Sequence, residues 1–596
     1  MLEPQTRAAL TEQLKPPHGF ELSRAVGTTF TLDLATALAV PLSFASHGLS
    51  AQHDALGVLD AIRRASDRVD VFAQAGVISM GTRSDLVAFL EPMIHPVTRP
   101  RGLFHPKVWF LEYRAGERLS YRFLCASRNL TADRSWDVLV RLDGAPAPEG
   151  HAHAAAEKNR PLTDLLRRLP SIAVQPLEVE RLADIEALAE RWRTVEWELP
   201  DPMRRVDFHV LGSHEPPTFE VRGARALIVS PFVSDDGLRT LRSRVRDQTH
   251  LVSRAETLDR LRPDALDDRL TTYVLDDAAA APSEEDDTDA HAPAPPGDRL
   301  VGLHAKAIVV DRIDGAHVFL GSANATGAAL EQNLEVMVEF VGPMPKVGVE
   351  ATLTALGELK EEYPTAGGAE PDATEQAERR LEAYLRSLAG VRFNARVLPG
   401  EPHSLRVWAD EPVAARDGFS VRWYLLTRPD LGSTTIVASE ADSVLLSGIP
   451  LAEITPFIVL EAHDAAGNQR RTILLARLLD DVVNRRDAVI ARQLTDRAAF
   501  VRLLTLLLEL SGAWRPAALG AASDGFFGAA TASDGATGLF EALVRALGEG
   551  HGGLSDARRI IDYLRDHGEA AVLPEGFDEL WRQVWAAHHE LTGAGA

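Results

Sequence analysis

Short apolar runs of strand length alternate with stretches of helical spacing along the first 345 residues. The pattern predicts a strand at residues 29–32, a helix that follows through residue 64, and a second strand at residues 69–72. After a helical connector at residues 157–197, a buried strand is predicted at residues 225–232 and a helix from residue 236. The same strand, helix, strand order in both parts predicts an α/β fold with pseudo-twofold symmetry.

The pattern changes after residue 345. A helix is predicted at residues 369–388, and short apolar runs separated by turns at residues 395–478 predict a small immunoglobulin-like β-sandwich. From residue 480 onward the spacing is helical, with a clear amphipathic segment at residues 539–547. This last part is interpreted either as a bundle that docks a protein partner or as a cap on the core.

Composition shifts divide the chain into consecutive segments. They are a first α/β half (20–145), a helical connector (146–204), a second half (205–345), a helical linker (346–394), the sandwich (395–478) and a helical domain (479–596). Residues 276–298 are acidic, rich in Ala and Pro and almost without large apolar side chains, which predicts a disordered loop. This loop is either a flap over a site or an inert insertion.

Lysine is rare, and its positions are informative. The chain has six lysines among 63 Lys and Arg residues, and two of the six occur in the chain's two His-x-Lys motifs, His105-Pro106-Lys107 and His304-Ala305-Lys306. In so Arg-rich a chain, Lys is expected where a compact point charge differs from a planar guanidinium. Residues two apart in a strand share a face, so each His and its Lys point the same way.

The repeat extends beyond these motifs. Each His-x-Lys precedes an apolar run, a turn, a second apolar run and a Ser-x-Asn loop, which ends at Asn129 in the first half and at Asn324 in the second. A repeat of this kind predicts one site at a pseudo-twofold axis, with His105 and His304 flanking a single phosphorus atom.

The residue types indicate phosphoryl chemistry. A neutral imidazole is a nucleophile toward phosphorus, and a second imidazolium can protonate the departing oxygen. Two Lys and two Asn side chains around the same phosphate would stabilise its developing charge, so no metal or other cofactor is required. Because His titrates near neutrality, a neutral to mildly acidic pH optimum is expected.

The doubled pattern resembles the phospholipase D superfamily, whose signature is His-x-Lys, four residues, Asp, and then a Gly-Ser-x-Asn loop in each half. The resemblance covers roughly residues 25 to 345. The second half matches fully, whereas the first has Glu112 in the Asp position and Ala126 in place of Gly. The resemblance implies a phosphohistidine intermediate, with the nucleophile usually in the first half (His105) and His304 as the acid and then the base.

The expected site residues fall into three sets. The catalytic set is His105, Lys107, Asn129, His304, Lys306 and Asn324. The supporting set is Glu112, Ser127, Asp137, Asp311, Ser322 and Glu335, of which Glu335 lies where the family often has a further carboxylate. The substrate-binding set is Arg101, Arg128 and Arg134, part of an Arg-rich stretch from Arg99 to Arg134 that is interpreted either as a basic mouth or as a solvated hairpin. Cys125, the only cysteine, is expected to pack in the core.

Composition limits the compartment and the partners. One cysteine excludes an intramolecular disulfide framework and fits a reducing cytoplasm. The amino terminus lacks the features of a signal peptide, and the longest apolar stretch, near residues 500–510, is too short to span a membrane. The net charge of −23 argues against indiscriminate coating of nucleic acid.

The sequence therefore predicts a cytoplasmic, metal-independent phosphodiesterase that acts on nucleic acid, with a nuclease role in bacterial defence against phage suggested by family analogy. Two alternatives stay open. One is a phospholipid phosphodiesterase, although no membrane association is expected. The other is a phosphate-binding scaffold whose C-terminal third recruits a protein partner such as a helicase.

Overall fold

The computed structural model describes most of the chain. The described residues are 10–45, 65–80, 85–131, 135–212, 219–275, 302–370, 372–413, 416–482, 485–493, 553–566 and 577–593, with 500, 504, 543, 572 and 573. Arg134, the predicted loop at residues 276–298 and, apart from Leu543, the amphipathic segment at residues 539–547 lie outside them. None of the described helices is long and apolar enough to cross a membrane.

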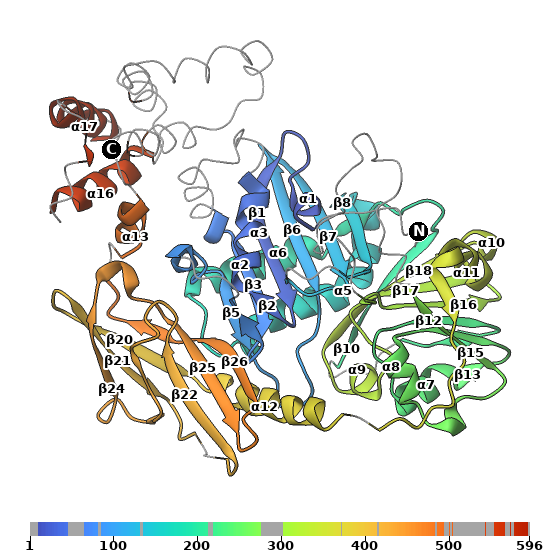
Figure 1. Cartoon of the computed structure of the whole chain (residues 1–596). Helices are drawn as coiled ribbons and strands as arrows, with labels where there is room; N and C mark the ends of the chain where they lie inside the picture. Colours follow the sequence, from blue (N-terminus) through green and yellow to red (C-terminus); the bar gives the residue numbers. More distant parts are fainter. Residues whose placement is uncertain are drawn as a thin grey trace, which may run out of the picture.

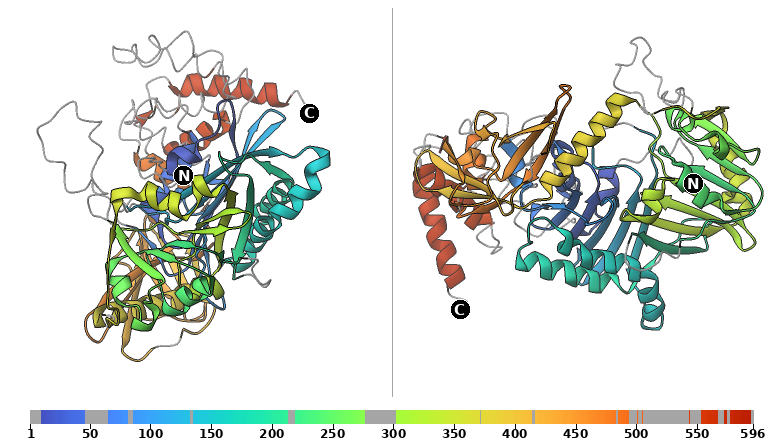
Figure 2. Two further views of the ribbon diagram at one scale, coloured as in Figure 1. Left: turned by 90° about the vertical axis from the view of Figure 1, so that its right-hand side faces the viewer. Right: turned by 90° about the horizontal axis from the view of Figure 1, so that it is seen from below.

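The first half is built on a seven-stranded mixed sheet of order β5-β3-β1-β6-β7-β8-β9. Its strands are β1 (Glu21–Thr29), β3 (Val69–Gln74), β5 (Ile94–Val97), β6 (Val108–Ala115), β7 (Arg118–Ala126), β8 (Leu139–Pro146) and β9 (Val195–Trp197). Helices α5 (Ala152–Arg168) and α6 (Val179–Trp192) pack on one face (Figure 2, right, teal). The other face carries the short helices α1 (Leu10–Leu14), α2 (Leu34–Ala37) and α3 (Ala39–Ala45).

The second half is built on an eight-stranded sheet of order β10-β18-β17-β16-β12-β14-β15-β19. Its strands are β10 (Arg205–Leu211), β12 (Ala226–Val229), β14 (Thr249–Val252), β15 (Leu270–Leu275), β16 (Ala307–Arg312), β17 (Gly315–Gly321), β18 (Glu335–Gly342) and β19 (Lys360–Glu362). One face carries α7 (Asp235–Arg242), α8 (Ala255–Asp259) and α9 (Gly327–Glu331), and the other carries α10 (Met344–Val347) and α11 (Val349–Leu356).

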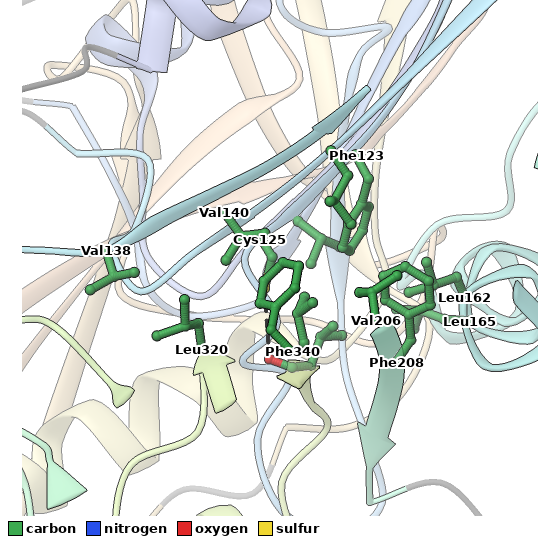
Figure 3. Packing of buried hydrophobic residues seen from close by; sticks show 14 of the residues in the cluster. Phe123, Cys125, Val138, Val140, Leu162, Leu165, Val206, Phe208, Leu320 and Phe340 are labelled. Carbon is green, nitrogen blue, oxygen red and sulfur yellow. Dashed lines mark hydrogen bonds between the residues drawn. The ribbon is translucent and has the colours of Figure 1, made fainter. Parts of the chain in front are cut away.

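The two sheets share one topology. In each, three parallel strands (β1, β3 and β5; β12, β14 and β15) are followed across the sheet by an antiparallel meander (β6, β7 and β8; β16, β17 and β18). Apolar side chains from both sheets form a common core, in which Phe123 and Cys125 of β7 lie near Leu320 and Phe340 of the second sheet (Figure 3). The predicted α/β fold with two pseudo-symmetric halves is thus confirmed.

Two strand predictions need correction. The strand predicted at residues 29–32 is wrong, because β1 ends at Thr29 and the Thr29 hydroxyl donates to the carbonyl of Thr31, 2.7 Å away, which turns the chain. The strand predicted at residues 225–232 is too long, because β12 ends at Val229 and Phe232 is exposed. In both halves the apolar residues beyond the strand belong to a turn at the end of the sheet.

A β-sandwich follows the second half, connected by α12 (Ala373–Ala389) (Figure 1). One sheet contains β24 (Val444–Ile449), β21 (His403–Ala409), β20 (Phe393–Leu398) and β27 (Arg477–Leu479), and the other contains β23 (Gly432–Ser433), β22 (Phe419–Leu425), β25 (Phe457–Asp464) and β26 (Gln469–Leu475). Both sheets contribute to one core, which confirms a small sandwich; its immunoglobulin-like character stays a prediction.

The sandwich and the C-terminal helices contact the first half. Thr472 of β26 exchanges hydrogen bonds with the backbone of Ile78, and Arg485 forms an ion pair with Glu91. The described C-terminal helices are α13 (Arg485–Gln493), α16 (Gly553–Asp566) and α17 (Phe577–Gly593).

Minor strand pairs are β2 (Leu32–Asp33) with β4 (Ile78–Ser79) and β11 (Arg222–Gly223) with β13 (Arg244–Val245). The 3-10 helices are η1 (Asp85–Phe89), η2 (Glu149–His151), η3 (Leu169–Ile172), η4 (Pro263–Ala265), η7 (Gly357–Leu359) and η8 (Leu451–Glu453).

Candidate active site

The two His-x-Lys motifs meet where the halves exchange backbone hydrogen bonds. The amide of His105 donates to the carbonyl of Leu334 at 3.0 Å, and the amide of His304 donates to the carbonyl of Trp136 at 2.8 Å. Leu334 and Trp136 occupy equivalent positions, because each lies directly before an acidic residue, Glu335 or Asp137. Each motif is therefore held by the other half, and the two halves build one site together.

Glu335 positions the His105 ring. Its Oε2 lies 2.8 Å from His105 Nδ1 and 2.5 Å from the hydroxyl of Ser322, and Asn333 Nδ2 lies 3.4 Å from its Oε1. The Glu335 side chain is fully buried. Since a carboxylate only accepts hydrogen bonds, His105 donates through Nδ1 and carries its lone pair on Nε2. Burial lowers the pKa of His105, although the nearby Glu335 charge opposes this effect.

Both motif lysines are buried. Lys107 Nζ donates to the carbonyl of His105 at 3.0 Å, and Lys306 Nζ donates to the carbonyls of His304 and Ser127 at 2.9 and 3.3 Å. In the described part of the chain neither ammonium forms an ion pair. Burial lowers the pKa of Lys107 well below its usual value and lowers the pKa of Lys306 to about 8, while the Glu335 charge opposes both shifts. Asp137 also raises the pKa of Lys306, which places this carboxylate within electrostatic reach of the second motif.

The two Ser-x-Asn loops are fixed by the same hydrogen bonds. The hydroxyls of Ser127 and Ser322 accept from the amides of Val138 and Val336, at 2.8 and 3.0 Å. Directly after each Asn, the amides of Leu130 and Ala325 donate to the hydroxyls of Thr29 and Ser230, both at 3.0 Å. These bonds tie each Asn loop to the turn that follows the first strand of its own half.

The two asparagines differ in their partners. Asn129 Oδ1 accepts from the amide of Thr31 at 3.3 Å, and Asn129 Nδ2 lies 3.5 Å from the Thr31 hydroxyl. Asn324 Oδ1 is buried and has no hydrogen-bond partner among the described residues. The first-half amide is thus held by the protein, whereas the second has an acceptor oxygen that no described residue pairs.

Glu112 and Asp311 lie away from this centre. Each is five residues beyond its Lys along β6 or β16, a distance of about 16 Å in an extended strand. Glu112 binds Arg191 of α6 at 2.6 Å and the hydroxyl of Ser23 at 2.8 Å. Asp311 binds Arg225 at 2.8 Å and the first amide of α11, that of Val349, at 3.0 Å. Glu112 thus connects β6 to helix α6, and Asp311 connects β16 to the start of helix α11.

The predicted basic mouth is wrong for three of its arginines. Arg114 and Arg118 lie beside the β6–β7 turn, at the opposite end of the hairpin from the motif, and Arg122 binds Asp143 at 2.6 Å. Arg99 donates to the carbonyls of Leu103, Gln332 and Gly212. Of the proposed substrate-binding residues, Arg101 is exposed near the motif, and half-buried Arg128 donates to the carbonyl of Thr131.

Cys125 is a buried core residue. Its thiol lies 3.8 Å from the carbonyl of Val336, and burial raises its pKa to about 12. A thiol with so high a pKa is protonated at neutral pH and is a poor nucleophile.

Several residues near the centre were not predicted from sequence. Phe30 packs on His105 with ring centroids 5.0 Å apart, and Lys107 Nζ lies 5.9 Å from the same ring. Asn333 binds Glu335, and its Oδ1 accepts from the amide of Leu103 at 2.9 Å. Arg254 donates to the carbonyl of Leu303, directly before His304. The rarity of Asn in the chain was the one available signal for Asn333.

Each His-x-Lys motif is held by backbone hydrogen bonds from the opposite half of a doubled sheet. The chain resembles the phospholipase D superfamily. No family model and no curated protein matches the chain. Among solved structures, yeast tyrosyl-DNA phosphodiesterase is similar with a TM-score of 0.33 and 12% identity, over 56% of this chain and 86% of that one.

Two further solved structures are similar at the same level. Phosphatidylserine synthase of Haemophilus influenzae matches with a TM-score of 0.30 and 12% identity, over 64% of this chain and 91% of that one. Polyphosphate kinase from Porphyromonas gingivalis matches with a TM-score of 0.31 and 13% identity, over 63% of this chain and 51% of that one. These likenesses are weak, so the resemblance to the phospholipase D superfamily depends on the motifs and their arrangement.

Proposed function

We propose that this protein is a metal-independent phosphodiesterase that hydrolyses nucleic-acid phosphodiesters through a phosphohistidine on His105. The observation that carries the proposal is the pair of buried lysines, Lys107 and Lys306, beside a histidine oriented by Glu335. Two buried ammonium groups without a carboxylate partner in the described structure favour an anion between them. A phosphodiester supplies that anion.

We assign the nucleophile to His105. Its Nδ1 is occupied by Glu335, so Nε2 presents a lone pair, and its lowered pKa keeps the ring neutral at physiological pH. As positive charge develops on the ring during attack, the buried Glu335 carboxylate stabilises it.

The reaction proceeds in two displacements. His105 Nε2 attacks phosphorus, and the bond from phosphorus to the leaving oxygen breaks as the His304 imidazolium gives that oxygen a proton. Water then attacks the same phosphorus while His304 takes a proton from it, and the bond from phosphorus to His105 breaks. Lys107, Lys306 and the Nδ2 group of Asn324 donate to the equatorial oxygens throughout.

Nucleic acid is favoured as the substrate by the guanidinium groups near the first motif. Exposed Arg101 and half-buried Arg128 would contact phosphates that flank the reacting one. Because Arg114, Arg118 and Arg122 lie elsewhere, these two contacts are the ones expected from the described part of the Arg-rich stretch, and the dependence of the affinity on salt should be correspondingly modest.

The test is incubation of the pure protein with labelled DNA, RNA and phosphatidylcholine in EDTA, beside the variant His105→Asn. Cleavage of a nucleic acid by the native protein alone, in EDTA, is the expected result. Hydrolysis of phosphatidylcholine without action on nucleic acid would change the substrate class. If nothing is cut and a protein partner binds residues 395–596, the scaffold alternative replaces the enzyme.

A further inference from the structure

Phe232 is the only Phe, Tyr or Trp side chain exposed to solvent in the described part of the chain, with 44% of its surface accessible. It lies in the turn after β12, where the hydroxyl of Ser230 donates to the Phe232 carbonyl at 2.7 Å. The same hydroxyl accepts from the amide of Ala325, the residue after Asn324. The exposed ring is therefore tied to the Asn loop of the second half.

Arg254 connects the ring to the second motif as well. Its guanidinium carbon lies 5.0 Å from the centre of the Phe232 ring, and its Nη2 donates to the carbonyl of Leu303, next to His304, at 2.9 Å. Its charge lowers the pKa of Lys306, so the guanidinium lies within electrostatic reach of that ammonium. A planar cation and an exposed ring thus stand together at the rim of the candidate site.

The equivalent position in the first half is Thr31. The Thr29 hydroxyl donates to its carbonyl just as Ser230 donates to that of Phe232, and both residues lie next to an isolated bridge to the Asn loop. Thr31 binds the Asn129 amide through its own backbone and hydroxyl, which makes that end of the site polar. The two ends of a pseudo-symmetric site therefore differ: Phe232 is exposed at the second, whereas at the first Phe30 is half-buried against the His105 ring.

We propose that Phe232 stacks on an unpaired nucleobase next to the scissile phosphate, so that the enzyme selects single-stranded nucleic acid. This inference rests on the proposed phosphodiesterase function and names its substrate class. Every nucleobase has a planar π-face, whereas the acyl chain of a lipid gains nothing specific from a single ring backed by a guanidinium. In a duplex the bases are already stacked on their neighbours, and freeing one costs energy.

The experiment compares two labelled single-stranded oligonucleotides that differ only next to the cleaved phosphate. One carries bases on both sides, and the other carries abasic tetrahydrofuran residues there. We expect the native protein to cleave the first with a kcat/KM about tenfold higher, a typical effect of one base–aromatic stack. Phe232→Ala should abolish this preference by slowing only the base-containing substrate, and Phe232→Trp should keep it.

The matched control is Ile313→Ala. Ile313 is fully exposed in the turn between β16 and β17, at the end of that hairpin remote from the motif, and its truncation should leave both rates unchanged. Equal cleavage of both oligonucleotides by the native protein overturns the stacking proposal and leaves the phosphodiesterase standing. A preference that survives in Phe232→Ala also overturns it. If the native protein cuts neither oligonucleotide, the proposed function itself fails.

Discussion

Replacing Glu335 by Gln removes one buried negative charge and keeps the size of the side chain. Glu335 Oε2 accepts two short hydrogen bonds, from His105 and from Ser322. A hydrogen bond to a charged acceptor is about twice as strong as a neutral one, so each of the two loses roughly 1–1.5 kcal/mol. Only the His105 bond strengthens as that ring becomes positive, so a loss of about 1–1.5 kcal/mol in this state predicts a roughly 5- to 13-fold lower kcat/KM.

The same variant should move the pH profile. The Glu335 charge raises the pKa of His105, Lys107 and Lys306, so Glu335→Gln should shift the alkaline limb of kcat/KM, expected near pH 8 in the native protein, to lower pH. The assay is steady-state cleavage of a labelled oligonucleotide between about pH 5 and 9.

Glu339→Gln is the matched control for this variant. Glu339 lies four residues along the same strand, is also buried, and binds two histidines, His209 at 2.7 Å and His317. Both substitutions therefore remove a buried carboxylate that contacts histidine, but only Glu335 touches the motif. Equal losses of activity in the two variants would mean that Glu335 acts through stability alone, and an unchanged pH profile in Glu335→Gln would refute its electrostatic role.

Three further predictions concern the motifs. His105→Ala and His304→Ala should each reduce cleavage by about 10³-fold or more, with the double variant hardly worse, because the two rings act as one unit; additive losses in single-turnover assays would contradict this. Lys107→Arg and Lys306→Arg should each cost about 100-fold, because the buried space fits a point charge; full activity of both would show that only the positive charge matters. In the native protein kcat/KM should fall as pH rises through about 8, when Lys306 loses its proton, and a rate that keeps rising to pH 9 would exclude a requirement for that ammonium.

The local motifs and the doubling of the fold were predictable from the sequence. His-x-Lys followed by a hairpin and Ser-x-Asn is a pattern of neighbouring residues, and its repetition indicates a pseudo-twofold fold. The strands of the two sheets were also predictable, because each strand is a short apolar run next to a turn. Glu335 could be proposed as a supporting residue because it is the first residue of the strand that follows the second Ser-x-Asn loop. Asp137 lies two residues before the strand that follows the first loop.

Contacts made between distant segments were not predictable in this way. Phe30 and Phe232 lie in apolar runs that continue β1 and β12, so the pattern assigned them to strands, whereas hydroxyls at Thr29 and Ser230 turn the chain there. The arginines of the β6–β7 hairpin are close in sequence to the motif, yet an antiparallel hairpin carries them to its far end. Sequence proximity to a site is a poor guide once a strand of eight residues intervenes.

The central claim is a covalent phosphohistidine on His105, and trapping it tests that claim most directly. The variant His304→Asn lacks the base that activates water, and an oligonucleotide p-nitrophenyl ester has a leaving group that needs no proton from His304. With this substrate the oligonucleotide fragment should stay attached to the variant after the first displacement. Mass spectrometry of the acid-labile adduct is predicted to place it on the peptide that contains His105, with no adduct in His105→Asn. An adduct on His304 in the native protein, or cleavage in a single turnover without any adduct, would contradict the account.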